Sequence, residues 1–394
     1  MTIGKVEPGQ APLTQITPGK WLKQNLFNSW YNSILTIVSL LIVYWVASQL
    51  LNWAFSEADW TVLQANLRLF FVGRYPVKSL WRAWVTLGVI VTLGGISWGV
   101  LAHQAARLFT PRILVILSML AIASGLVVRL GGVQSSVILL GMLLLLIAAA
   151  LLGKKLSGWL PNLHSWLPVL WLFAFSFDIW LLLGGSNVNL DRVSGLMLTI
   201  PVAIISILLC FPFGVLLALG RQSDLPVIRW LSIAYIELVR GVPLITIIFM
   251  AQVMLPLVLP PDVRLDRIIR AIAGFTLFSA AYLAENVRGG LQSIPRGQRE
   301  AAKALGLNSV YALWFIILPQ ALKTVIPSMV GQFIALFKDT SLLAIVGMTD
   351  LLGMSQSILA NPKYLGRYGE VYLFVAAIYF VCCYAMSAAS RKLE

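Results

Sequence analysis

The chain has 394 residues, of which 59% are hydrophobic and only 11% are charged. A soluble globular protein averages about 25% charged residues, so these values argue against a water-soluble enzyme, exclude an intrinsically disordered protein and indicate an integral membrane protein. The net charge of +14 is expected in loops that face anionic lipid, with no nucleic-acid partner.

Ten apolar stretches follow along the chain, each close to the roughly 20 residues that a helix needs to cross a bilayer. The first begins near Ile34, after a polar segment, and is too long for a cleavable signal. We therefore predict an all-α, polytopic helical membrane protein with about ten spans, at 32–52, 83–102, 113–129, 136–152, 166–184, 196–219, 241–259, 270–287, 313–336 and 371–389.

The basic residues of the loops give an orientation. Arg221 and Arg229, together with Arg288 to Lys303, fall on one side of the membrane if both termini are cytoplasmic. Segments 64–82 and 262–270 carry further basic residues on the opposite side, so the charge bias is weak.

Composition divides the chain into two parts. Residues 1–192 hold five uniformly apolar spans, in which Asp178 is the only carboxylate. Residues 193–394 hold spans interrupted by proline and charge, which mark functional pathways in membranes. The functional residues are therefore expected in 193–394, and Asp178 is expected to pair across helices or to lie near the outer interface.

The loop after the eighth span predicts a short surface helix. Pro295 can start this helix and Gly306 can end it, because glycine accepts a left-handed conformation. Alanines between them leave a nearly bare face that could enter a cleft of a partner, and Glu300 could pair with Lys303. Asn308 or Ser309 would cap the following helix. The alternative is an ordinary solvated loop.

The spacing in this loop fits the EAA signature of ATP-binding-cassette importer permeases. Glu300-Ala301-Ala302 is followed by three residues, Gly306, nine residues, Ile316, one residue and Leu318-Pro319, so the loop at about 293–319 fills every fixed position. Further segments at 195–221, 236–245, 280–294 and 338–347 resemble the polar amino acid permease family. Residues 66–81 and the additional N-terminal spans resemble the longer permease subunit of general L-amino acid importers.

This resemblance implies an import function and a set of partners. Residues 193–394 would form a five-helix permease core, and Glu300, Ala301, Ala302 and Gly306 would form a coupling helix that docks on a cytoplasmic ATPase. The chain has no phosphate-binding G-x-x-x-x-G-K-[ST] motif, so ATP and Mg²⁺ would be bound by that ATPase and this chain would hold no cofactor. A second, different and shorter permease and a soluble periplasmic amino-acid-binding protein would complete a complex in the bacterial inner membrane.

An L-amino acid is a zwitterion, so its site needs an anion for the ammonium group and donors for the carboxylate. These groups occur together in Lys338, Asp339, Thr340 and Ser341, after a span broken by prolines. Asp339 is the candidate for the ammonium group. The alternative is that Lys338 and Asp339 form an interfacial pair that ends the helix.

Glu285 is a further candidate substrate residue, because a carboxylate in a span indicates function. Its alternative role is a salt bridge to Arg288, three residues on. His103 and His164 are too far apart in the chain to suggest a metal site.

Two other classes of function fit the sequence less well. A membrane-embedded lipid-modifying enzyme needs clustered catalytic residues at one membrane face, and the sequence lacks such a cluster. A proton-coupled secondary carrier needs buried titratable groups in matching repeats. The sequence thus favours an importer permease that works by alternating access and is not itself an enzyme.

Overall fold

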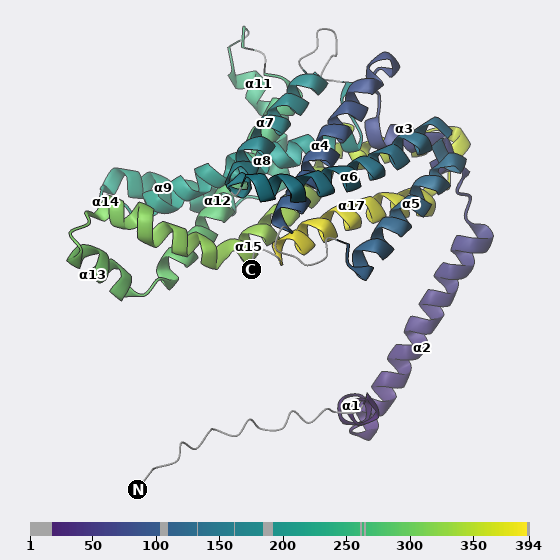
Figure 1. The fold of residues 1–394 in the computed structure, drawn as a ribbon, viewed down its shortest axis with the longest axis horizontal. Helices are drawn as coiled ribbons and strands as arrows, with labels where there is room; N and C mark the ends of the chain where they lie inside the picture. The colour runs from purple at the N-terminus through teal and green to yellow at the C-terminus, as the bar shows by residue number, and fades with distance from the viewer. Residues whose placement is uncertain are drawn as a thin grey trace. The chain divides into compact units, whose positions relative to one another are not determined.

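The protein is built from α-helices, as the sequence predicts (Figure 1). The computed structural model describes residues 18–102, 109–131, 133–160, 162–183, 192–260, 262–263 and 265–391. The helices of the first half are α1 (Pro18–Asn25), α2 (Trp30–Asn52), α3 (Thr61–Val72), α4 (Leu80–Leu101), α5 (Pro111–Gly131), α6 (Val133–Trp159) and α7 (Leu163–Leu183). Those of the second half are α8 (Leu196–Arg221), α9 (Pro226–Arg240), α10 (Leu244–Phe249), α11 (Leu255–Val258), α12 (Arg267–Ser293), α13 (Arg296–Ala304), α14 (Ser309–Ala312), α15 (Leu318–Asp339), α16 (Leu351–Leu359) and α17 (Tyr368–Ser390). No residue of the described ranges belongs to a β-strand, and one isolated bridge joins Gly195 to Asp350.

The helices agree with the predicted membrane spans. Within the described residues, eight helices are long and apolar enough to cross a bilayer, and a ninth span is formed if α9 and α10–α11 count as one bent element. These elements match nine of the ten predicted spans. The tenth, at 113–129, lies in α5, part of whose side chains falls outside the described residues.

Helix α9 departs from the sequence-based prediction, which placed Arg229 in a loop. Pro226 occupies the first turn of α9, where its missing N–H has no partner to lose. Pro243 stops the helix from continuing, and the chain turns by 104° before α10. The predicted span at 241–259 is therefore only the second arm of a bent pair, because the charged residues of α9 hid its helical character from a hydropathy count.

The described chain separates into two units. The smaller, Met1–Asp59, contains α1 and α2, and no residue of α2 is buried. The larger, Trp60–Glu394, contains all other helices. Within it α3 packs against α16 and α17, where Phe70 shares a core with Leu351 and Val371. Residues on both sides of position 192 thus contribute to one packed unit, and the functional division at 192 stays a prediction.

Helix α12 is the central element of the larger unit and packs against α8 on one side and α15 on another. Gly290 permits a close approach to α15, because a Cβ atom there would lie 2.6 Å from the carbonyl oxygen of Ala321. Near its other end, Ile268 packs in a cluster with Tyr75 and Leu182. Helix α12 therefore connects two opposite ends of this unit and leads directly into the predicted coupling loop.

Candidate functional site

Helix α13 carries the predicted coupling motif and follows α12 after a break at Pro295. Glu300 and Ala301 are exposed, whereas Ala302 is only 1% exposed because α14 and the π-helical turn Leu313–Ile317 pack against α13. The expectation that the alanines form one bare face is therefore wrong for Ala302, which faces its own chain. No ion pair joins Glu300 to Lys303 among the described side chains, in keeping with the small value of such surface pairs.

Gly306 ends α13 as the sequence predicts. Its φ is +76°, in the left-handed region. The Gly306 N–H donates to the Lys303 carbonyl at 3.0 Å, and the Leu307 N–H donates to the Ala302 carbonyl at 3.1 Å. This pair of hydrogen bonds defines a Schellman motif. Of the two candidate caps of the next helix, Asn308 is used, since its side chain accepts from the Tyr311 N–H at 2.9 Å.

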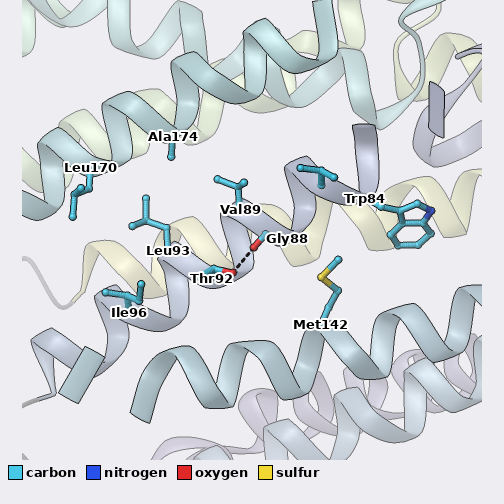
Figure 2. A pocket seen from close by; sticks show the side chains of 10 residues that line it. Trp84, Gly88, Val89, Thr92, Leu93, Ile96, Met142, Leu170 and Ala174 are labelled. Carbon is cyan, nitrogen blue, oxygen red and sulfur yellow. Dashed lines mark hydrogen bonds between the residues drawn. The ribbon is translucent and has the colours of Figure 1, made fainter. Parts of the chain in front are cut away.

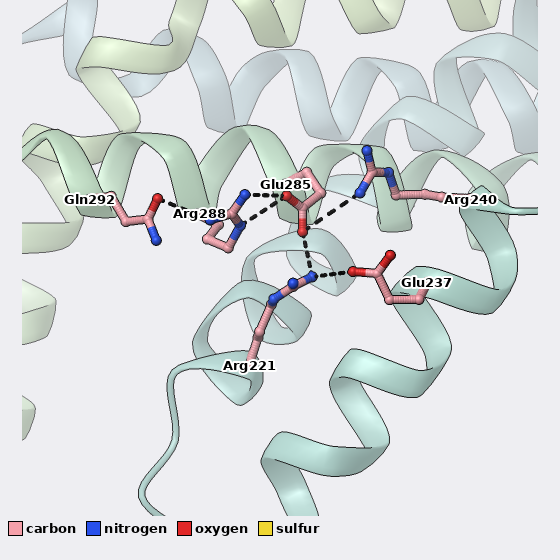
Figure 3. A network of polar contacts seen from close by, with 6 residues as sticks. All are labelled: Arg221, Glu237, Arg240, Glu285, Arg288 and Gln292. Carbon is pink, nitrogen blue, oxygen red and sulfur yellow. Dashed lines mark hydrogen bonds and ion pairs between the residues drawn. The ribbon is translucent and has the colours of Figure 1, made fainter.

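An ion-pair network joins the C-terminal ends of α8 and α9 to α12, about two turns before α12 ends (Figure 3). Its centre is Glu285, whose side chain is 15% exposed. Arg221 Nη1 donates to Glu285 Oε1 at 2.6 Å and to Glu237 Oε1 at 3.0 Å, and Arg240 Nη1 lies 3.9 Å from Glu285 Oε1. Arg288 donates to Glu285 Oε2 from Nη2 at 2.7 Å and from Nε at 2.9 Å.

Both carboxylate oxygens of Glu285 are thus engaged by fixed guanidinium groups. Cations are also favoured at this place because the C-terminal ends of α8 and α9 carry partial negative charge. The contacts agree with the salt bridge to Arg288 that the sequence offered as one alternative for Glu285. They give no support to a substrate contact, which stays a prediction.

The predicted substrate residues lie at the C-terminal end of α15. Asp339 is its last residue and is half-buried, while Lys338 is exposed. No hydrogen bond or salt bridge engages either side chain among the described residues, although the Lys338 charge lies close enough to act on the Asp339 carboxylate, so the alternative of an interfacial pair stays open. Thr340 is fully buried, and its hydroxyl donates to the Phe337 carbonyl at 2.6 Å, whereas Ser341 is partly exposed.

The position of Asp339 suits a cationic ligand. Asp339 ends the α-helical part of this span, and a 3-10 turn continues at Thr340–Ala344. The dipole of α15 favours an ammonium group near this end. Glu285 does not share this place. Helices α12 and α15 come into close contact at Gly290 and Ala321. Glu285 lies about 8 Å from this contact along α12, and Asp339 lies about 27 Å from it in the same direction along α15, at 1.5 Å per residue. The two carboxylates are therefore roughly 20 Å apart along the helices. Glu285 therefore lies away from residues 338–341 and nearer to the end of α12 that leads into the coupling loop.

Asp350 is a buried carboxylate that the sequence reasoning missed. It is fully buried and caps α16, accepting from the N–H groups of Leu352 at 3.1 Å and Gly353 at 2.9 Å. Burial raises the pKa of Asp350 to about 6, against the opposing effect of these amides and of the Tyr379 hydroxyl. An aspartate directly before an apolar helical run is the sequence signal that could have identified this cap.

A large apolar cavity lies elsewhere, between α4, α6 and α7, with a volume of about 610 Å³. Figure 2 shows its wall, formed by side chains such as Trp84, Met142 and Leu170, with the Thr92 hydroxyl donating to the Gly88 carbonyl. It contains none of the predicted site residues. No cluster of metal-ligating side chains occurs in the part of the chain that the structure describes.

Comparison with known proteins gives a consistent set of relatives. Residues 210–394 match the family model described as "Binding-protein-dependent transport system inner membrane component". The inner membrane amino-acid ABC transporter permease protein YhdY of Escherichia coli (strain K12) is 38% identical over 395 residues, which cover 95% of this chain and 91% of that protein. The glutamate/glutamine/aspartate/asparagine transport system permease protein BztC of Rhodobacter capsulatus is 36% identical over 98% of this chain and 95% of its own length.

A shorter relative matches about half of the chain. The probable glutamine ABC transporter permease protein GlnP of Bacillus subtilis (strain 168) is 38% identical over 200 residues, covering 51% of this chain and 90% of that protein. The similarity to YhdY and BztC, in contrast, extends over nearly the whole chain, including the N-terminal spans. This multi-pass membrane protein therefore belongs to the family of amino-acid ABC transporter permeases.

Proposed function

We propose that this chain is the permease subunit of an ATP-binding-cassette importer that moves L-amino acids across the cytoplasmic membrane by alternating access. The observation that carries the proposal is α13, a short helix with an exposed Glu300-Ala301 surface and a fixed glycine end. ATP and Mg²⁺ are bound by the partner ATPase, and this chain contributes no cofactor site. Neither a secondary carrier nor a lipid-modifying enzyme is favoured by any contact described above.

The ion-pair network joins the helices that precede α13 to one another. Glu285 on α12 binds Arg221 on α8 and lies near Arg240 on α9, so three helices are joined about two turns before the chain enters the loop. A force applied to α13 by the ATPase is then transmitted to these helices together rather than absorbed by a flexible loop. This is the physical requirement for rocking a permease between inward-facing and outward-facing states.

Asp339 holds the ammonium group of the substrate in this proposal, and Lys338 and Ser341 supply donors to its carboxylate. Support comes from the lack of a hydrogen bond or salt bridge to Asp339 among the described residues and from its place where the α-helical part of this span ends. Thr340 contributes through its buried hydroxyl, which fixes the turn after α15.

Partners follow from the family and from the length of the chain. An importer of this kind contains two permeases, and we infer that the second is a different, shorter chain that resembles GlnP in length. A soluble periplasmic binding protein delivers the amino acid. With α13 on the cytoplasmic side and α5 crossing the membrane as a tenth span, both termini of this chain are cytoplasmic as well.

The function is tested by reconstituting the permease with its second permease and its ATPase in liposomes. We expect uptake of a labelled L-amino acid that requires internal ATP and an external binding protein. A matched preparation that lacks the ATPase is the control. ATP-independent uptake driven by a pH gradient would instead identify a secondary carrier and overturn the proposal.

A further inference from the structure

A second cavity lies between α3, α4, α7 and α8 and has a volume of about 220 Å³. None of the coupling or substrate residues lines it. Its wall is apolar except at two side chains, Asp178 of α7 and Thr86 of α4. Because one water occupies about 30 Å³ of liquid, the space is large enough for a small polar headgroup.

The Asp178 carboxylate needs a hydrogen-bond donor, and the Thr86 hydroxyl is able to accept from the same donor group. Asp178 is only 5% exposed, and its Oδ1 is buried with no hydrogen-bond partner among the described residues. The Thr86 hydroxyl oxygen is also buried and also has no hydrogen-bond partner among the described residues. A buried carboxylate without a partner is costly, and native structures satisfy more than about 90% of such groups. A group with several N–H donors and a positive charge fits both oxygens.

The cavity lies near one membrane face. Asp178 is five residues before the end of α7 and Thr86 is six residues after the start of α4, which puts both roughly 8–9 Å inside the helix ends. The same end of the unit contains Ile268 at the start of α12, which packs with Leu182 of α7. Since α12 leads into α13 at its other end, the cavity lies at the face opposite the coupling helix.

The rim of the cavity is apolar and open. Phe71 of α3, Ile90 of α4 and Ile204 of α8 line it and are 44%, 41% and 36% exposed. In a membrane protein, exposed apolar side chains of this kind face acyl chains. The occupant that matches all these features has a cationic donor at one end and a hydrocarbon chain at the other.

We propose that this cavity binds an aminophospholipid, with the primary ammonium group against Asp178 and Thr86 and an acyl chain along Phe71, Ile90 and Ile204. A metal ion fits less well, because two oxygens in an apolar wall are far from the six or more ligands that a hard cation takes. A free amine would satisfy Asp178 but would leave the apolar rim without a role.

The test is lipid binding to the intact, delipidated permease complex, measured by native mass spectrometry. Phosphatidylethanolamine, phosphatidylglycerol and phosphatidylcholine with matched acyl chains are titrated separately. We expect retention of phosphatidylethanolamine above the other two, and a loss of about tenfold or more in its affinity in Asp178→Asn. The Asp262→Asn variant, which changes an exposed aspartate in a loop, is the matched control and should bind like the wild type.

A second variant keeps the test independent of folding. Thr86→Val preserves shape and removes one acceptor, so it should weaken phosphatidylethanolamine binding several-fold while the thermal melting of the complex is retained. Equal binding of the three lipids, or unchanged phosphatidylethanolamine affinity in Asp178→Asn, would overturn the proposal. Displacement of the lipid by free ethanolamine or by an L-amino acid at matched concentration would also overturn it, because the ligand would then be a free amine.

Discussion

A carboxylate in a membrane protein can be stabilised by fixed cations, by hydrogen-bond donors of its own chain or by a ligand. The first and the last of these concern the two candidate carboxylates. Glu285 is of the first kind, because the guanidinium groups of Arg221 and Arg288 occupy both of its oxygens. We propose that Asp339 is of the last kind, because it is half-buried and no hydrogen bond or salt bridge engages it among the described residues. The two residues look alike in the sequence, and only the contacts separate their roles.

Replacing Asp339 by asparagine should reduce ATP-dependent uptake about ten- to a hundredfold, because a buried bond to a charged partner contributes about 1.5–3 kcal/mol. The measurement is the initial uptake rate in proteoliposomes. Asp224→Asn, at an exposed aspartate before α9, is the control. Co-purification of the ATPase should be unchanged, so wild-type uptake by Asp339→Asn would remove this residue from the substrate site.

Asp350 makes stability depend on pH. Its pKa of about 6 in the folded state lies above the ordinary value of 3.8, so its contribution is fully present below about pH 4 and is lost as pH rises through 6. A shift of about two units corresponds to roughly 3 kcal/mol. Asparagine retains the cap of α16 without the charge.

Thermal unfolding of the detergent-solubilised complex between pH 4 and pH 7.5 checks this expectation. The wild type should lose stability relative to Asp350→Asn as pH rises, and the two proteins should differ least at pH 4. Parallel melting curves across this range would mean that Asp350 does not titrate differently in the folded protein.

At the scale of single elements, α13 depends on its C-terminal end and on what it presents to solvent. A β-branched residue at position 306 cannot adopt φ +76° without strain, although open space surrounds Gly306. Gly306→Val should therefore misdirect the loop, and Glu300→Lys should reverse a charge on the exposed surface. Both variants should lose at least tenfold in uptake per ATP hydrolysed, while insertion in the membrane persists.

ATPase activity and uptake measured on the same proteoliposomes give this ratio. Gly297→Val is the matched control, because Gly297 lies on α13 in open space and has no left-handed φ. Normal coupling in both test variants would show that α13 is an ordinary solvated loop segment, the alternative that its composition allowed.

The elements also show why some features could be predicted and others could not. The role of Gly306 can be predicted because it depends on local backbone conformation, and the long spans can be predicted because apolar length is itself the signal. The burial of Ala302 cannot be predicted in this way, since it depends on how α14 packs against α13. The bond from Arg221 to Glu285 joins residues 64 positions apart, and no local pattern carries that information.

At the scale of the whole molecule, the packed unit from Trp60 onward combines a segment before residue 192 with the helices of the importer core. The contact of Phe70 with this core could not be predicted from composition, because uniform apolarity marks a span without saying which neighbour it packs against. The family similarity over nearly the full chain agrees with this integration. We still expect substrate selection at 338–341. The two charged residues of this segment, Lys338 and Asp339, are complementary to the carboxylate and ammonium groups that all L-amino acids share.

That composition leads to a prediction about substrate range. After Lys338 and Asp339 the chain continues through Leu342 and Leu343, which are wholly or partly buried and offer no charge to a substrate side chain. A site that binds the ammonium and carboxylate groups alone should accept several L-amino acids, with affinities within about 200-fold of each other, since differences in uncharged contacts are worth about 1–3 kcal/mol. Competition uptake with acidic, basic and neutral L-amino acids measures this range, and the D-enantiomer of each competitor is the control. Inhibition confined to one charge class would require a charged side chain near the pathway that 338–341 do not provide, and would contradict the broad range.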